Sequence, residues 1–170
     1  MKMKYFFLVL LGIFLLSCDN EEADLNTVKS LDISKFMGDW YVLAVIPNFI
    51  EEGATNGIES YALDNKGNVN IEYTFRKNGK TKTMKARGFV QDGTNAFWKV
   101  QFLWPVKLPY LVIDLDENYQ YTVIGVPNRK FVWIMAREPQ IDEYIYQNIL
   151  NKLEKTGYDV KLIKPMQQTW

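Results

Sequence analysis

Few residues of this chain could do chemistry, and their types limit what that chemistry can be. The 170 residues include no histidine and one cysteine, Cys18. Histidine acid–base catalysis, a Ser-His-Asp or Cys-His catalytic unit and histidine metal sites are therefore excluded, and one thiol cannot form an internal disulfide. Lysine and arginine number 20, as do aspartate and glutamate, so the balanced charge predicts no nucleic-acid partner. We predict no metal, no cofactor and no enzyme, because catalysis would have to rely on carboxylates or tyrosine alone.

The best candidate for a metal site is an acidic stretch that matches only the first part of a calcium-binding loop. Asp114–Asn118, of sequence DLDEN, begins like a calcium-binding EF-hand loop. The sixth position is Tyr119 where that loop needs glycine, and the twelfth is Gly125 where it needs glutamate. The stretch therefore predicts a turn with solvated carboxylates. A basic stretch is typical of a solvated hairpin, and contact with anionic lipid headgroups is the alternative. Its residues are Arg76, Lys77, Lys80, Lys82, Lys85 and Arg87.

Cys18 stands where a lipid anchor would be attached. Met1–Lys4 carries two lysines, and Tyr5–Leu16 is an apolar run of 12 residues, too short for a bilayer core that needs about 20. A basic start and a short apolar run are typical of a secretory signal peptide. The ending LLSC at Leu15–Cys18 resembles the lipobox of bacterial lipoproteins, in which the cysteine receives a diacylglycerol and the chain is cut just before it. We predict a signal peptide over residues 1–17 and lipid attachment at Cys18; an ordinary signal peptide with a chance cysteine is the alternative.

An acidic segment follows the predicted anchor. Asp19–Asp24 reads DNEEAD, which predicts a solvated tether over residues 18–30, ahead of one folded domain over residues 31–170. Two or more acyl chains on Cys18 would hold the protein on a membrane stably. We expect the cell envelope, and within it the outer membrane. The leaflet stays open, because an acidic start resembles surface-export signals in some bacteria, whereas Asp19 directly after the cysteine resembles an inner-membrane retention signal in others.

The body of the chain alternates apolar and polar residues in short runs, which is the pattern of β-strands. Turn residues separate the runs, and Asn78-Gly79 is typical of a two-residue hairpin. No segment between the runs is long enough for a helical crossover, so we expect an antiparallel sandwich or closed barrel. The eight predicted strands cover residues 40–46, 58–63, 69–76, 83–90, 96–103, 110–115, 119–126 and 131–137.

One helix should follow the strands and pack on the last of them. Apolar residues recur every four positions over Ile141–Leu153, with Pro139 just before this stretch and Gly157 just after it. The strand Phe131–Arg137 is apolar at both odd and even positions, so we expect the interior to cover one of its faces and the helix the other. The tail at residues 161–164 could add a short ninth strand.

Three motifs in chain order resemble those of the lipocalins. Gly38–Tyr41 (GDWY) is similar to the G-x-W opening of that family, Val112–Asp116 (VIDLD) to its second motif and Arg137 to its third. The resemblance spans nearly the whole chain after the tether and is strongest to the bacterial outer-membrane lipocalins. It implies an all-β fold, an eight-stranded antiparallel up-and-down barrel with one C-terminal α-helix packed outside. In such a barrel Trp40 would plug the closed end, Arg137 would lie on its ring as a cation–π lid, and Gly38 would let the chain turn beneath.

The same resemblance implies a ligand cavity, the calyx. It places Tyr61, Val100, Phe102, Tyr110, Ile124 and Trp133 on the calyx wall, and alternation along the strands adds Val42, Ala44 and Met135. An apolar, aromatic-rich lining suits the chain of a fatty acid or lysophospholipid, bound for storage or transport in the envelope. A barrel filled by its own side chains, acting as an interaction module, is the alternative, and a lipid-modifying enzyme is a further one.

The stretch Phe102–Val106 (FLWPV) is unusually apolar for a connection between strands. It could line the mouth of the calyx, touch a membrane or form a homodimer. Alternatively, Trp104 could pack beneath a neighbouring loop.

Overall fold

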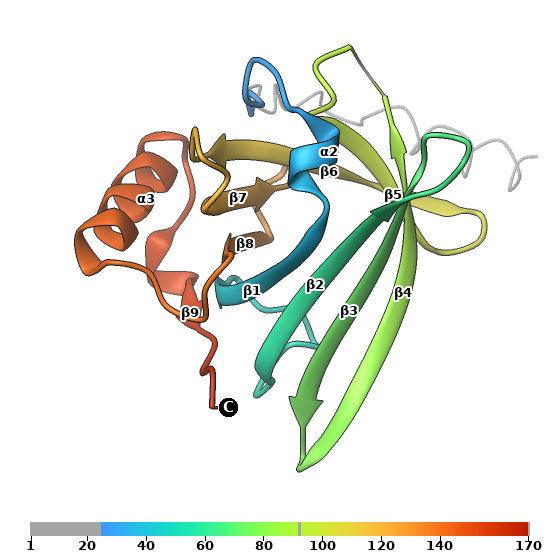
Figure 1. The fold of residues 1–170 in the computed structure, drawn as a ribbon. Coiled ribbons are helices and arrows are strands. Elements are labelled where there is room, and N and C mark those ends of the chain that lie inside the picture. Colours follow the sequence, from blue (N-terminus) through green and yellow to red (C-terminus); the bar gives the residue numbers. More distant parts are fainter. Residues whose placement is uncertain (1–24, 92, 170) are drawn as a thin grey trace, which may run out of the picture.

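The computed structural model describes residues 25–91 and 93–169 (Figure 1). The predicted signal peptide, Cys18 and residues 18–24 of the predicted tether lie outside these residues. Among the described residues, no helix is both long enough and apolar enough to cross a membrane.

Eight antiparallel strands form a sheet that closes on itself. Strands β2 to β8 pair with their neighbours in chain order, β1 lies beside β8, and β1 also pairs with β2 to close the barrel. This confirms the predicted up-and-down barrel. The strands are β1 (Gly38–Val45), β2 (Thr55–Leu63), β3 (Val69–Lys77), β4 (Lys80–Val90), β5 (Phe97–Leu103), β6 (Val106–Leu115), β7 (Tyr121–Gly125) and β8 (Val132–Ala136).

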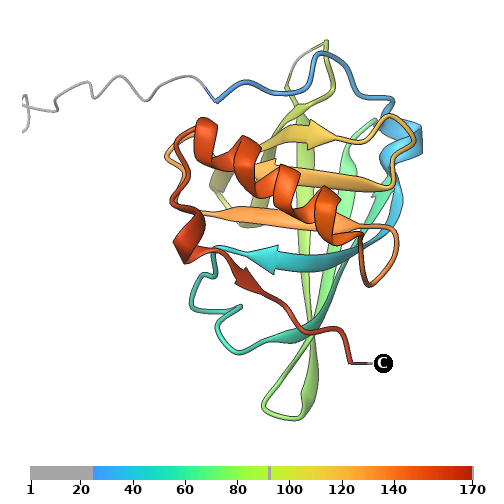
Figure 2. The ribbon, with the colours of Figure 1, turned by 90° about the vertical axis from the view of Figure 1, so that its left-hand side faces the viewer.

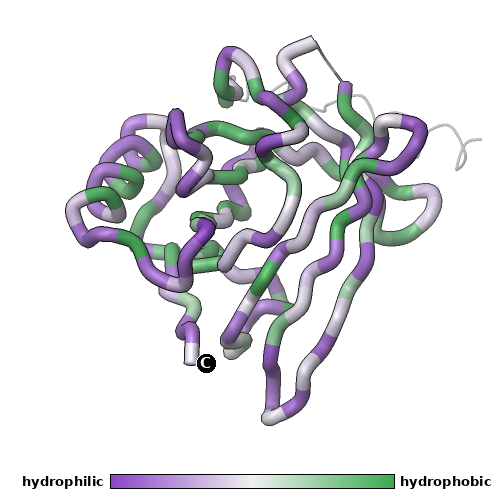
Figure 3. The backbone as a smooth tube through the Cα atoms, in the orientation of Figure 1, coloured by the Kyte–Doolittle hydropathy of each residue, from purple (hydrophilic) through white to green (hydrophobic). Residues whose placement is uncertain are grey.

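Alternation along the strands divides the side chains between the interior and the outside. In β3, Val69, Ile71, Tyr73 and Phe75 are buried and the residues between them are more exposed. Figure 3 shows the matching alternation of hydrophobic and hydrophilic positions along this part of the sheet. The inward residues form an inner cluster that includes Trp40 and Trp98 of the closed end. Burial of these large apolar side chains is the main force that holds the barrel closed.

A single long helix, α3 (Glu143–Lys155), lies across the outside of the barrel (Figure 2). Its first turn is capped by Asp142, whose side chain accepts a hydrogen bond from the Tyr144 N–H at 2.8 Å. An outer cluster of buried residues joins the helix to the barrel: Ile149 and Leu153 from α3 pack with Val132 and Ile134 of β8. Strand β8 is therefore covered on both faces, as predicted.

Several element boundaries differ from the predictions; β2 and β6, for example, begin at Thr55 and Val106 rather than at residues 58 and 110. Two of the differences have local reasons. Strand β7 begins at Tyr121 because Tyr119 has a φ of 59° and belongs to the turn before it. The ninth strand, β9, is Lys164–Pro165, which pairs with Ala44 and Val45 of β1. It begins later than predicted because Val160–Leu162 forms a 3₁₀ turn, η1.

A short helix, α2 (Ile33–Phe36), leads into β1 at the closed end. Asp32 caps it by accepting the Ser34 N–H at 3.0 Å. Phe36 is fully buried, with its ring centroid 5.0 Å from that of Trp40 and 5.5 Å from that of Trp98. These three aromatic side chains fill the closed end of the barrel.

Ala44 does not face the calyx, so that part of the predicted lining is wrong. In β1, Val42 pairs with Met135 and the next pair is Ala44 with Ile134, so β1 carries one extra residue at this point. Such a bulge shifts the alternation of the following side chains. Val42 stays in the inner cluster, whereas Ala44 joins the outer cluster and Val45 takes the inward position.

Candidate functional site: the calyx

A cavity of about 360 Å³ opens into the barrel from the end opposite Trp40. Four of the residues predicted to line the calyx do line it: Val100, Phe102, Tyr110 and Trp133. The rest of the wall is also mainly apolar, and the loops at the mouth contribute to it. The other lining residues are Asn48, Phe49, Ile50, Glu51, Glu59, Ile71, Tyr73, Met84, Ala86, Leu108, Pro109, Val126 and Phe131.

The remaining predicted lining residues lie in the packed part of the interior. Val42, Ile124 and Met135 are fully buried in the inner cluster and do not reach the cavity. Tyr61 is also buried, and its hydroxyl donates a hydrogen bond to Glu59. The interior is therefore filled at its closed end and hollow toward its mouth.

Two buried carboxylates belong to the site and were missed by the sequence analysis. Glu59 and Glu51 are 7% and 4% exposed, and both line the cavity. For Glu59 a signal existed, because it shares the inward face of β2 with Tyr61, two residues away. For Glu51 there was none, because it lies in the loop between β1 and β2, where no alternation applies.

Glu59 forms a polar cluster with two phenols at the inner end of the cavity. The hydroxyls of Tyr61 and Tyr110 both donate to Oε2 of Glu59, the latter at 3.0 Å, and also contact one another. Burial raises the pKa of Glu59 from its ordinary 4.5 to about 7, although the two phenol hydrogen bonds oppose this change. Burial and the neighbouring carboxylate also raise the pKa of Tyr61 and Tyr110, so both phenols remain protonated donors.

Glu51 connects the mouth loop to the wall. Its Oε1 accepts the indole N–H of Trp133 at 2.6 Å, and its Oε2 accepts the Asn48 N–H at 3.2 Å. Burial raises the pKa of Glu51, against the effect of these hydrogen bonds. Both oxygens of Glu51 are therefore engaged: Oε1 holds the loop against β8, and Oε2 fixes the turn within the loop itself.

The residues predicted as the plug meet at the closed end. The Arg137 guanidinium carbon lies 3.8 Å from the centre of the Trp40 ring, and the Trp40 indole N–H donates to the Phe36 carbonyl at 2.8 Å. Arg137 also donates to the carbonyl oxygens of Lys35, Phe36, Met37 and Asp39 at 2.7–3.2 Å. Gly38 has a φ of 92°, and a Cβ there would lie 3.4 Å from Arg137. This arrangement closes the barrel and brings no reactive group to the cavity.

The mouth of the calyx carries exposed apolar side chains. Phe49, Leu103 and Trp104 are 86%, 76% and 82% exposed. Trp104 therefore does not pack beneath a neighbouring loop, and that alternative is wrong. Exposed apolar side chains grouped in this way are typical of surfaces that contact another apolar surface.

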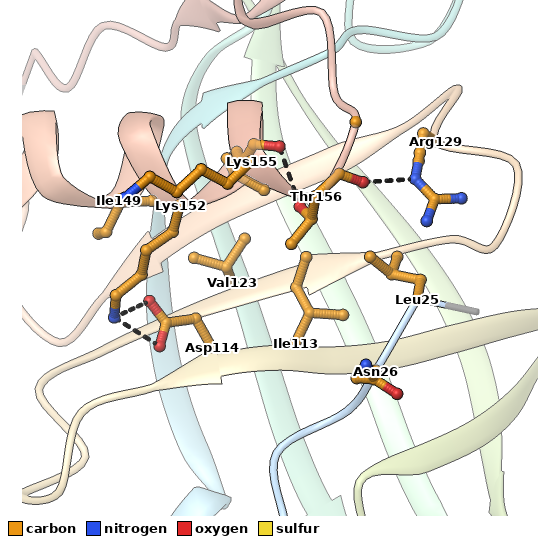
Figure 4. Close-up of a pocket in the computed structure, with 12 residues that line it drawn as sticks. Leu25, Asn26, Ile113, Asp114, Val123, Arg129, Ile149, Lys152, Lys155 and Thr156 are labelled. Carbon is orange, nitrogen blue, oxygen red and sulfur yellow. Dashed lines mark hydrogen bonds and ion pairs between the residues drawn. The ribbon is translucent and has the colours of Figure 1, made fainter. Parts of the chain in front are cut away.

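A second hollow, of about 710 Å³, lies outside the barrel between α3 and strands β6 and β7 (Figure 4). Its floor is apolar, with Ile113, Val123 and Ile149. Two of the cations beside it are engaged within the fold: the Lys152 ammonium lies 2.8 Å and 3.0 Å from the Asp114 carboxylate oxygens, and Arg129 Nε donates to the Thr156 carbonyl at 2.7 Å. We take the calyx as the candidate site, because it is a mainly apolar cavity inside the barrel.

Residues 31–168 match the family described as a lipocalin-like domain. The chain is a lipocalin. Lipocalins are typically binding proteins without enzymatic activity.

Relatives of this lipocalin include membrane lipoproteins and eukaryotic proteins. Temperature-induced lipocalin-1 of Arabidopsis thaliana is 29% identical over 88% of this chain and 86% of its own. Outer membrane lipoprotein Blc of Vibrio cholerae is 26% identical over 98% of this chain and 99% of its own. Apolipoprotein D of Bos taurus is 30% identical over 66% and 64%. The fold also matches insecticyanin of Manduca sexta, with a TM-score of 0.67 at 18% identity over 86% of this chain and 85% of that one.

Proposed function

We propose that this lipocalin binds fatty acids or lysophospholipids in its calyx and stores or carries them for upkeep of the cell envelope. The observation that best supports the proposal is the mainly apolar cavity of about 360 Å³, left open beyond a tightly filled closed end. Burial of an acyl chain at about 25 cal/mol per Å² is enough for micromolar affinity after the costs of association.

The charges around the cavity favour a ligand that enters tail first. Among the described residues, no lysine or arginine lines the cavity. At the rim, the Lys77 ammonium lies 3.1 Å and 3.0 Å from the carbonyl oxygens of Phe49 and Ile50. An anionic carboxylate or phosphate headgroup would therefore stay at the mouth, near Lys77 and water, with its chain inside.

The proposed location is the outer membrane, with the protein anchored through acylated Cys18. Two relatives of the lipoprotein Blc type carry "outer membrane" in their names, which supports this location. The exposed Phe49, Leu103 and Trp104 would then bring the mouth against the lipid surface from which the ligand comes. A homodimer through the same rim is a second proposal that these side chains favour.

Filling the cavity tests the proposed function. Ala86 lines the cavity, and Ala62 of β2 is exposed on the outside. By calorimetric titration with palmitate and with lysophosphatidylcholine, we expect micromolar binding to the native protein and at least about tenfold weaker binding to Ala86→Trp. The matched control, Ala62→Trp, should bind like the native protein. No binding by the native protein, or unchanged binding by a folded Ala86→Trp variant, would contradict the proposal.

A further inference from the structure

The calyx has an unusual charge for a lipid cavity. Two carboxylates, Glu51 and Glu59, line it, and no lysine or arginine does so among the described residues. Glu51 near the mouth has both oxygens engaged. Glu59 is therefore the group that determines which polar atoms can enter deeply.

One oxygen of Glu59 is left for a ligand. Both phenols, Tyr61 and Tyr110, donate to Oε2, and Oε1 accepts no hydrogen bond from any described residue. Among those residues, Oε1 of Gln168 is the one side-chain polar atom that is both inaccessible to solvent and without a hydrogen bond. Oε1 of Glu59 is therefore not completely inaccessible. Because Glu59 is 7% exposed and lines the cavity, its free Oε1 opens into that cavity.

Aromatic side chains make up much of the wall of the cavity that Glu59 lines. Tyr110 is stacked between Trp98 and Trp133, with ring centroids 5.6 Å and 6.3 Å away. Tyr73 and Phe131 also belong to the aromatic part of the cavity wall. A carboxylate among aromatic side chains suits a cation, because the ring faces also attract positive charge.

We propose that the calyx selects an apolar molecule carrying a protonated amine, which enters amine first and donates to Oε1 of Glu59. Glu59 is thus the specificity-determining residue of the cavity. This inference rests on the proposed function, since it requires that the calyx bind apolar chains, and it adds a preferred headgroup that reaches the inner end to the tail-first ligands proposed above. A fatty acid can enter only tail first, because its carboxylate would meet Glu59 with no cation beside it.

Proton release on binding supplies a second test of the contact between the ligand ammonium and Glu59. Burial holds the pKa of Glu59 near 7, so part of the protein carries a protonated Glu59 at neutral pH. An ammonium at Oε1 favours the ionised form and should therefore expel that proton. The other titratable groups facing Glu59 are Tyr61, Tyr73, Tyr110 and Glu51; the raised pKa of each phenol keeps it protonated, and Glu51 keeps its hydrogen bonds.

The test uses three ligands of equal chain length on the full chain: dodecylamine, dodecanol and dodecanoate. In calorimetric titrations at pH 8, we expect dodecylamine to bind at least about tenfold more tightly than dodecanoate, because a hydrogen bond to a charged group is involved. Glu59→Gln should weaken dodecylamine binding by about tenfold or more and leave dodecanol within about threefold. Glu72→Gln, on an exposed carboxylate of β3, is the matched control and should change none of the three.

Titrations at pH 6.5 in buffers of different ionisation enthalpy give a readout that does not need the variant to fold. Dodecylamine binding should release protons from the native protein, and dodecanol binding should not. Dodecanoate binding as tightly as dodecylamine, or amine binding without proton release, would overturn the inference while leaving the proposed function intact. Failure of all three ligands to bind would overturn both.

Discussion

Glu59 is the residue whose setting departs most from ordinary barrel packing. A carboxyl that is 7% exposed loses most of its hydration, and two phenol hydrogen bonds restore only part of that stabilisation. Its pKa is therefore raised to about 7. The folded protein holds a proton on Glu59 at pH values where the unfolded chain has lost it, so the ionised carboxyl opposes folding. A residue with this cost is more readily explained by ligand selection than by stability.

The pH dependence of unfolding should report this cost. The contribution of Glu59 to stability is fully present below pH 4.5 and is lost as the pH rises to about 7. Over that interval we expect the free energy of unfolding of the native protein to fall by about 3 kcal/mol more than that of Glu59→Gln. Chemical denaturation at several pH values measures the difference. Equal slopes for the two proteins would contradict the buried, protonated Glu59, and Glu72→Gln should keep the native slope.

At the scale of elements, the segment after α3 is tied to the turn between β7 and β8. The Tyr158 hydroxyl accepts the Val126 N–H at 3.2 Å and donates to the Phe131 carbonyl at 3.3 Å. Gly125, at the end of β7, leaves room for this ring: a Cβ there would lie 2.5 Å from the Tyr158 hydroxyl and 2.9 Å from Ile113. The helix is thus held on the barrel by its C-terminal connection as well as by its apolar face.

Gly125→Ala should disturb this junction. We expect the free energy of unfolding to fall by about 1–3 kcal/mol, because the added methyl group must displace buried neighbours. Gly93→Ala is the matched control, since a Cβ at Gly93 meets nothing within 4 Å, and should change stability by less than about 0.5 kcal/mol. Thermal or chemical melts of the two variants provide the comparison, and equal stabilities would show that the junction tolerates the methyl group.

The elements could be predicted well because their signals are local. Alternation in Val69–Phe75, the Asn78-Gly79 turn and the four-residue repeat of α3 each act within one element, and the structure has all three. The family motifs then supplied the closed barrel, which alternation alone left open to a sandwich.

What could not be predicted depends on contacts between elements. The bulge between Val42 and Ala44 is set by pairing with β8 and carries no mark in the sequence of β1. The division of the interior into a filled end and a cavity depends on the sizes of facing side chains, so Ile124 and Met135 could not be separated from Val100 in advance. Glu59 lies on the same inward face of β2 as Tyr61, and it was missed because an apolar lining was expected on that face.

At the scale of the whole molecule, one end of the barrel is filled by side chains and the other contains an open cavity. Phe36, Trp40 and Trp98 fill the closed end under the Arg137 lid. The mouth is rimmed by exposed apolar side chains such as Trp104 and opens on the cavity. The absence of histidine and the single cysteine exclude the commonest catalytic units.

Native mass spectrometry of the protein purified from the cells that produce it tests this account most directly. We predict one apolar amphiphile per chain, released on lipid extraction and absent from Ala86→Trp, with Ala62→Trp retaining it. The intact mass should also show acyl groups on Cys18. A native protein that is empty and that also takes up none of the added lipids or amines would contradict the central claim that the calyx is a ligand-binding site.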